Sequence, residues 1–318
     1  MRRSGLIALV ATTMLVAAAC ASDQGAGSTP TIDSANAVTE PVVFITADSL
    51  PEVEPITAQP GPNAPMRIVS LANGVGETLA ALGVADRVVG RDETSDVAGI
   101  TDAPVVTKAH SVSAERVLDL SPDLVLVDAA TAPVEALAQI AGAGVEVVEV
   151  PEAWTLADMG PRISAVAAAV DVDPDELIRS LPSTSDPDSA QPQPRVAFVY
   201  LRGTSGIYLL GGAGSGADAL ITAAGGVDVG AEEDFDPFVP LTAESLVTLN
   251  PDILLVMTKG LASVNGLDGL LALPGVAQTN AGKNSRVIVV DDEVLLSFGP
   301  RTPALVDQLR EALSTVMN

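Results

Sequence analysis

The sequence of 318 residues contains a single cysteine and a single histidine. A disulfide needs two cysteines, and a zinc site of cysteine and histidine ligands cannot be assembled from one of each, so both features are excluded. Basic residues are also scarce, because 16 Lys and Arg stand against 41 Asp and Glu, for a formal net charge of -25. So acidic a chain repels a phosphate backbone, and its longest basic run is only Arg2-Arg3. We therefore expect no nucleic acid partner.

A long hydrophobic run is missing as well. The apolar stretch from Leu6 to Ala19 has 14 residues, fewer than the roughly 18 to 20 that span a bilayer. Because two arginines precede it, the pattern predicts a signal peptide over residues 1–19. The next residue is Cys20, and the sequence Ala-Ala-Ala-Cys resembles a bacterial lipobox. That resemblance implies a palmitate-bearing lipoprotein on the extracytoplasmic face of the cell membrane; an ordinary secretory signal followed by an incidental cysteine is the alternative.

The segment after the cysteine has the composition of a spacer. From Ala21 to Pro65 it carries seven prolines, six acidic residues and neither Lys nor Arg. Such a segment buries too little apolar surface to offset the entropy lost on ordering. We therefore expect a disordered tether over residues 20–65.

Alternating strand and helix patterns begin at Met66. Short apolar runs that are typical of buried strands alternate with helical patterns, which predicts mostly parallel sheet covered by helices. A second set of such patterns begins at Val196 and ends with a helix over Pro303–Val316. The expected fold is α/β, with two Rossmann-like lobes joined by a helical connection. The expected boundaries are 66–153 for the N-terminal lobe, 154–194 for the connector and 195–318 for the C-terminal lobe.

An internal repeat supports two lobes of similar build. Residues 113–127, SAERVLDLSPDLVLV, match residues 242–256, TAESLVTLNPDILLV, at a constant offset, with seven of 15 positions identical. Each copy is predicted to form a short helix, a Pro-Asp turn and a buried strand. Ligands of such two-lobed proteins usually lie in the cleft between the lobes.

Several segments resemble one family of binding proteins. They are RIVSLANGVGETLAALGVADRVVG at 67–90, the two Glu...Pro-Asp repeats, LPGVAQTNAGKNSRVIVVDD at 273–292 and FGPRTP at 298–303. The chain resembles the substrate-binding proteins of ABC importers of the class III periplasmic binding protein fold, which bind haem, cobalamin or ferric siderophores. The sequence VYLRG at 199–203, GPRTP at 299–303 and a histidine five residues before Glu115 resemble the haem-binding branch. The resemblance implies a monomeric receptor that catalyses no reaction and delivers ferric haem to a permease dimer and its ATPase.

The strand over 195–202 places two candidate ligand residues side by side. Its period-two alternation puts Tyr200 and Arg202 on one face. A phenol is a poor iron ligand until it ionises, and an adjacent guanidinium favours the ionised form, a hard donor suited to ferric iron. The resemblance implies that Tyr200 and His110 are the two axial ligands of the haem iron. It also makes Arg202, Arg301 and Lys108 candidate partners of the haem propionates.

Each of these residues also has an ordinary structural explanation. A tyrosine in an apolar strand is most often part of a core, and a histidine in a polar loop is most often solvated. Arg301 and Lys108 are equally explained as surface charges.

Two repeated acids, Glu115 and Glu244, occupy equivalent places in the two lobes. The resemblance implies that they dock onto arginines of the permease, because acids at two matched points give register as well as attraction. An acid in the first turn of a helix, favoured there by the helix dipole, explains each one singly.

Three further observations bear on these expectations. A ferric siderophore or cobalamin remains an alternative ligand within the class. The run from Gly212 to Ala217 fits G-x-G-x-x-A, a weak dinucleotide fingerprint that leaves a nucleotide-dependent oxidoreductase as a less favoured alternative. Pro174 and Pro182 would interrupt the long connecting helix that is usual in the class, so a differently built hinge is expected.

Overall fold

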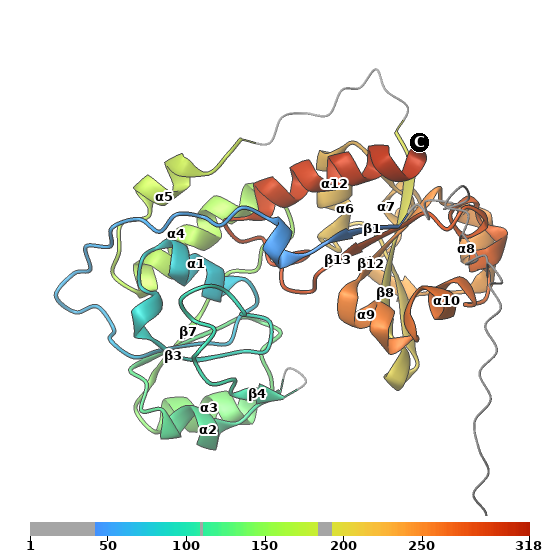
Figure 1. Ribbon diagram of the computed structural model, residues 1–318. Coiled ribbons are helices and arrows are strands. Elements are labelled where there is room, and N and C mark those ends of the chain that lie inside the picture. The colour runs from blue at the N-terminus through green and yellow to red at the C-terminus, as the bar shows by residue number, and fades with distance from the viewer. Residues whose placement is uncertain (1–41, 109–110, 184–192) are drawn as a thin grey trace, which may run out of the picture. The chain divides into compact units, whose positions relative to one another are not determined.

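The computed structural model describes residues 42–108, 111–183 and 193–318, which form two main sheets with helices on both faces and one short two-stranded sheet (Figure 1). Cys20 and His110 lie outside these residues. Within the described ranges, no helix combines the length and apolar character needed to cross a membrane. We call the smaller sheet and its helices the N-terminal lobe, and the larger sheet and its helices the C-terminal lobe.

The N-terminal lobe contains a four-stranded parallel sheet in the order β3-β2-β6-β7. A short antiparallel pair, β4 and β5, accompanies it. The strands are β2 (Ile68–Ser70), β3 (Val88–Arg91), β4 (Thr107–Lys108), β5 (Ser111–Val112), β6 (Leu124–Val127) and β7 (Glu146–Glu149). The helices are α1 (Val75–Ala81), α2 (Ala114–Asp119), α3 (Val134–Gly142), α4 (Met159–Ala169) and α5 (Asp175–Ser180).

Both faces of this sheet are buried, which explains its nearly continuous apolar strands. Ile68 and Leu124 point to the face covered by α1 and α4, whereas Val69 and Val125 point to the face covered by α2 and α3. All four side chains are at most 1% exposed. Figure 1 shows these two helical layers on opposite sides of β3 and β7.

The C-terminal lobe contains a seven-stranded mixed sheet in the order β1-β13-β12-β8-β9-β11, with β10 also paired to β8. Its strands are β1 (Val42–Ile45), β8 (Arg195–Arg202), β9 (Ile207–Gly211), β10 (Val227–Asp228), β11 (Phe238–Pro240), β12 (Ile253–Met257) and β13 (Val287–Val290). Its helices are α6 (Ala217–Ala224), α7 (Val229–Glu232), α8 (Ala243–Leu249), α9 (Thr258–Ser263), α10 (Gly266–Leu271), α11 (Asn280–Lys283) and α12 (Thr302–Met317).

The central strand β8 follows the predicted alternation. Val196, Phe198 and Tyr200 contribute to the core beneath α6 and α12. Ala197 and Val199 contribute to the opposite core, beneath α8 and α10. The predicted common face of the even-numbered residues is therefore confirmed, and the expected α/β fold with two lobes is confirmed with it.

The internal repeat is also confirmed as a repeat of structure. Each copy forms a short helix, α2 or α8, followed by the buried strand β6 or β12. The helices begin in the same way, because the hydroxyls of Ser113 and Thr242 accept the backbone N–H three residues on. Each helix is followed by one residue of positive φ, Ser121 at 49° and Asn250 at 43°.

The repeated Pro-Asp turn fixes the neighbouring strand. The carboxylate of Asp123 accepts the backbone N–H of Arg67, and that of Asp252 accepts the backbone N–H of Arg195. The two arginines in turn donate to carbonyls at the ends of α2 and α8. The identical Pro-Asp in both copies thus has a structural role at the start of a central strand.

The structure differs from the expectation of disorder over the carboxyl-terminal part of the expected tether. Residues 42–65 are part of the folded body, because β1 pairs with β13 and Ile45 and Leu50 are at most 4% exposed. The prolines and acids of this segment lie mainly at exposed positions, while most of its apolar residues, with the exception of the exposed Phe44, pack against the two lobes. The prediction of disorder for this part was wrong, because composition does not reveal pairing with a strand that is distant in the sequence.

The connection between the lobes is built from short helices. The helix α4 ends at Ala169 and α5 at Ser180, with Pro174 between them. The helical patterns expected in this stretch are therefore present, and the chain turns where the prolines predicted an interruption.

Candidate functional site

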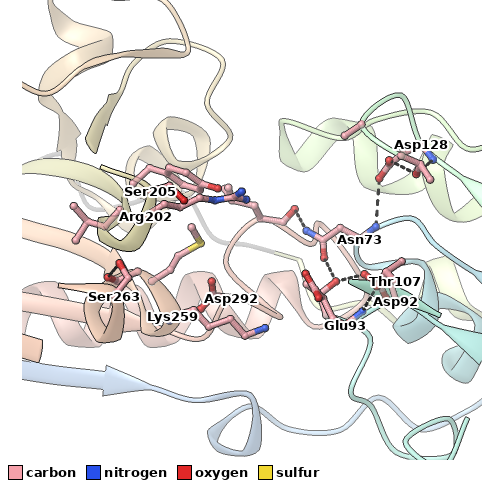
Figure 2. Close-up of a pocket in the computed structure, with 18 of the residues that line it drawn as sticks. Asn73, Asp92, Glu93, Thr107, Asp128, Arg202, Ser205, Lys259, Ser263 and Asp292 are labelled. Atoms are coloured by element: carbon pink, nitrogen blue, oxygen red, sulfur yellow. Dashed lines mark hydrogen bonds between the residues drawn. The ribbon is translucent and has the colours of Figure 1, made fainter. Parts of the chain in front are cut away.

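A cavity of about 480 Å³ is lined by residues of both lobes (Figure 2). Most of the polar residues that line it share one position in the fold, at or just beyond the carboxyl end of a parallel strand. They include Asn73 after β2, Asp92 after β3, Asp128 after β6, Arg202 at the end of β8, Lys259 after β12 and Asp292 after β13. This edge of an α/β sheet is where ligands bind, because the strand ends converge there.

Tyr200 and Arg202 stand together in the C-terminal wall of the cavity. The Cζ atom of Arg202 lies 5.3 Å from the centre of the Tyr200 ring. The ring also packs edge-to-face against Phe238, with a centroid distance of 5.8 Å. The strand spacing predicted this pair, and the structure brings both side chains to the cavity.

A second cation of this wall was not predicted. Lys259 lies in the first turn of α9, where its backbone N–H donates to Asp292 Oδ2 at 2.8 Å, and its exposed side chain lines the cavity (Figure 2). The sequence did carry a signal for it, since Lys259 follows a buried strand by two residues and strand ends are where ligand contacts gather.

The N-terminal wall is polar and largely acidic. Thr94 Oγ1 lies at hydrogen-bonding distance from Asp92 and from Asn73, and Thr107 Oγ1 accepts the backbone N–H of Glu93. Burial raises the pKa of the Asp92 carboxyl, and hydrogen bonds from Ser95 and Thr94 partly offset the rise. A network of this kind holds its side chains in place before a ligand arrives.

The charges of the two walls are unequal. Among the side chains that the structure describes, two cations line the cavity, Arg202 and Lys259, and both belong to the C-terminal lobe, which also contributes Asp292. Asp92, Glu93 and Asp128 belong to the N-terminal lobe. An anionic group of a ligand is therefore favoured at the C-terminal wall.

Two of the expected ligand contacts, Lys108 and His110, stand in the sequence at the end of β4 and between β4 and β5. His110 lies outside the described residues. Lys108 ends β4, and its backbone pairs with Ser111. The preceding residue, Thr107, lines the cavity, so the backbone of this hairpin begins at the cavity wall.

Arg301 is not among the residues that line the cavity. Its side chain is 10% exposed, its Nε lies 3.5 Å from Glu77 Oε1, and its Nη1 donates to the carbonyl of Ala47 at 3.0 Å. Its backbone N–H also donates to Glu77 Oε1, at 2.6 Å. Burial raises the pKa of Glu77, and the positive charge of Arg301 partly offsets the rise. In this structure the side chain of Arg301 is paired with a carboxylate of α1, and its contact with a ligand carboxylate stays a prediction.

Glu115 and Glu244 occupy equivalent exposed positions in the first turns of α2 and α8. On the same helices, Val117 and Leu246 face the core of their lobes and are fully buried. The structure thus holds the two acids on firmly packed helices while leaving them open to solvent.

The glycine-rich run from Gly212 to Ala217 does not have the features of a dinucleotide loop. The carboxylate of Asp218 accepts the backbone N–H of Gly214 at 2.8 Å and that of Gly216 at 2.9 Å. These are donors that a phosphate would need at such a loop. The strand before the loop, β9, is antiparallel to both of its neighbours, unlike the parallel strand of a dinucleotide fold.

Two α/β lobes that together line one cavity define the bilobal class of ligand-binding proteins. The chain belongs to the periplasmic binding protein family, whose model matches residues 68–294. An uncharacterized ABC transporter substrate-binding lipoprotein of Bacillus subtilis, YvrC, is 27% identical over 283 residues, which cover 82% of this chain and 86% of YvrC.

Solved structures show the same fold. The haem-binding protein HmuT is 31% identical with a TM-score of 0.74, over 85% of this chain and 97% of HmuT. The periplasmic haem-binding protein RhuT from Roseiflexus sp. RS-1 is 35% identical with a TM-score of 0.70, over 79% of this chain and 99% of RhuT. Further HmuT structures carry alanine in place of a histidine, of a tyrosine and of an arginine two positions beyond that tyrosine.

Proposed function

We propose that the protein is an extracytoplasmic receptor that captures ferric haem and delivers it to the permease of an ABC importer. The observation that carries this proposal is the pairing of Tyr200 with Arg202 in the wall of a cavity that both lobes line. A tyrosine and an arginine at the same two-residue spacing were each replaced in the haem-binding protein HmuT, which supports the same use of the pair here.

Tyr200 is the proposed iron ligand of the C-terminal lobe. Phenolate is a hard oxygen donor that suits ferric iron, and haem proteins use it. The positive charge of Arg202 lies 5.3 Å from the centre of the Tyr200 ring, a position that suits a ligand side chain carrying negative charge when it is bound to iron. His110 is the proposed second axial ligand, from the N-terminal lobe.

The remainder of the C-terminal wall suits a porphyrin with two carboxylates. Leu201, Met257 and Leu296 add apolar surface beside Tyr200. Arg202 and Lys259 supply positive charge for the propionates, and Lys108 stays a proposed contact. The unequal charge of the walls favours a haem whose propionates face the C-terminal lobe.

The remaining proposals concern the location and the partners of the receptor. We place a signal peptide at 1–19 and a lipid on Cys20, as the name of the lipoprotein YvrC supports. The exposed acids Glu115 and Glu244 are the proposed contacts with the permease dimer. We propose a monomer that carries its ligand unchanged and catalyses no reaction.

An equilibrium titration with haemin tests this function. The wild-type chain is expected to give a saturable shift of the Soret band at one haem per chain. Tyr200→Ala and His110→Ala are each expected to change the spectrum of the complex and weaken binding. If the wild-type chain gives no saturable shift with haemin but binds cyanocobalamin or a ferric siderophore, haem is not its ligand and one of these alternative ligands of the class is.

A further inference from the structure

Residues 42–65, which we call the N-terminal strap, are bound to both lobes in succession. The strap enters the C-terminal lobe as β1, whose four residues pair in parallel with Val287–Val290 of β13. Ile45 is 2% exposed within the core beneath α12. The first part of the strap is thus an edge strand of the larger sheet.

Side chains of the C-terminal lobe hold the strap beyond the end of β1. The backbone N–H of Asp291 donates to the carbonyl of Ile45 at 3.0 Å, and Asp291 Oδ2 accepts the backbone N–H of Ala47 at 2.9 Å. Ser49 Oγ donates to Gln308 Oε1 of α12 at 2.9 Å. Leu50, 4% exposed, is the last residue of the strap in this core.

The second part of the strap is bound to the N-terminal lobe. The backbone N–H of Ile56 donates to the carbonyl of Ala81 at the end of α1, and the backbone N–H of Gly61 donates to the carbonyl of Asp171, both at 2.9 Å. The side chains of Val53 and Ile56 pack against the core beneath α1 and α4. Gly83, at φ +74°, leaves room for this approach, since a Cβ there would stand 2.3 Å from the carbonyl oxygen of Ile56.

Only a short segment of the strap links its attachment on the C-terminal lobe to its attachment on the N-terminal lobe. Six residue steps join Leu50 to Ile56, and an extended chain covers at most about 3.5 Å per step, or about 21 Å in total. Separation of the two attachment points beyond that limit requires one of them to detach. Detachment exposes Leu50 or Ile56 and breaks backbone hydrogen bonds, which opposes it.

We propose that the N-terminal strap is a covalent restraint that limits how far the two lobes separate. Within the described residues, the helical connection provides no single long helix beside the strap, because α4 ends at Ala169 and α5 begins at Asp175. The Glu77–Arg301 ion pair joins the lobes at the same place, since Arg301 also donates to Ala47 of the strap. The inference is independent of the identity of the ligand.

Distance measurements between two spin labels test the restraint. The labels are attached to Glu135→Cys on α3 and Glu311→Cys on α12, both exposed positions, in a chain that also carries Cys20→Ser. One variant has ten Gly and Ser residues inserted after Glu52 in the strap. The matched control has the same insertion after Glu233, an exposed loop residue of the C-terminal lobe. We expect the strap insertion to broaden the distribution of distances by several ångströms and the control insertion to leave it unchanged.

A second variant excludes misfolding as the cause of a broadened distance distribution. It carries a protease recognition sequence after Glu52 and is cut after it has folded, so that the link is severed in a native protein. Hydrogen exchange at Val287–Val290 then reports whether β1 remains paired. Unchanged distances in the cut protein would overturn the proposal. Broadened distances that appear only together with loss of protection at β13 would also overturn it. The restraint would then depend on the pairing of β1 with β13 and not on the chain between Leu50 and Ile56.

Discussion

The guanidinium carbon of Arg202 lies 5.3 Å from the centre of the Tyr200 ring, and both side chains line the cavity. If Arg202 stabilises a phenolate on iron, its loss weakens ferric haem binding. We predict that Arg202→Ala lowers the affinity for haemin about tenfold, a typical value for one close cation. Arg116→Ala, on an exposed part of α2, is the control in the same titration. Equal affinities of Arg202→Ala and the wild-type chain would remove Arg202 from the site.

The two exposed acids at equivalent helix starts give a prediction about transport. Charge reversal of Glu115 and Glu244 together places like charges against the arginines that the family resemblance implies on the permease. Such repulsion costs several kcal/mol, so we predict a roughly 100-fold loss of affinity for the permease. The measurement is stimulation of the transporter ATPase, with haem affinity measured in parallel. Glu135→Lys, also in a first helical turn, is the control, and an effect as large there would point to net charge instead of docking.

Asp228 predicts a dependence of stability on pH. Burial raises the pKa of this carboxyl to about 6, while it accepts the backbone N–H of Ala231 at 2.7 Å. Between the ordinary value near 4 and about 6 the folded state binds more protons than the unfolded state, so this group lowers stability as pH rises through that window. The cost at pH 7.5 is about 3 kcal/mol.

An asparagine at this position keeps an acceptor for Ala231 but carries no charge. We predict that Asp228→Asn raises the urea midpoint of unfolding at pH 7.5 and has little effect near pH 4. A midpoint that responds equally at both pH values would contradict the assignment.

The buried pair of Glu77 and Arg301 gives a prediction about stability. Removal of one partner leaves an unpaired buried charge, so Glu77→Gln is expected to cost about 3 kcal/mol in the free energy of unfolding. The double variant Glu77→Leu, Arg301→Met removes both charges, and we expect it to be more stable than Glu77→Gln. Denaturant unfolding of Glu77→Leu, Arg301→Met and the double variant measures the coupling energy between the two side chains. Additive losses would show that the two groups do not depend on each other.

Much of the fold follows from patterns within short stretches of sequence. The repeat at 113–127 and 242–256 predicted both helix and strand in each copy, because the N-cap, the Pro-Asp turn and the apolar strand are local signals. The alternation in 195–202 placed Tyr200 beside Arg202 for the same reason. The strap was missed, because the pairing of Val42–Ile45 with Val287–Val290 joins segments that are distant in the sequence.

The same limit applies to the candidate site. Arg301 stood in a motif that suggested a ligand contact, but its partner Glu77 is 224 residues away and lies in another lobe. Lys259 and Asp92 line the same cavity only because the ends of their strands lie close together in the folded protein. Both residues follow a buried strand closely, and that position is the signal that the sequence carries for a ligand contact.

The central claim is that the Tyr200 oxygen binds the iron of haem, and resonance Raman spectroscopy of the ferric haem complex tests it most directly. The chain has two tyrosines, so Tyr208→Phe on β9 is a matched control for Tyr200→Phe. Tyr208 is absent from the lining of the cavity. We predict vibrations of iron-bound tyrosinate in the wild-type and Tyr208→Phe complexes and their loss in Tyr200→Phe. Persistence of those vibrations in Tyr200→Phe, or their absence from the wild-type complex, would contradict the account.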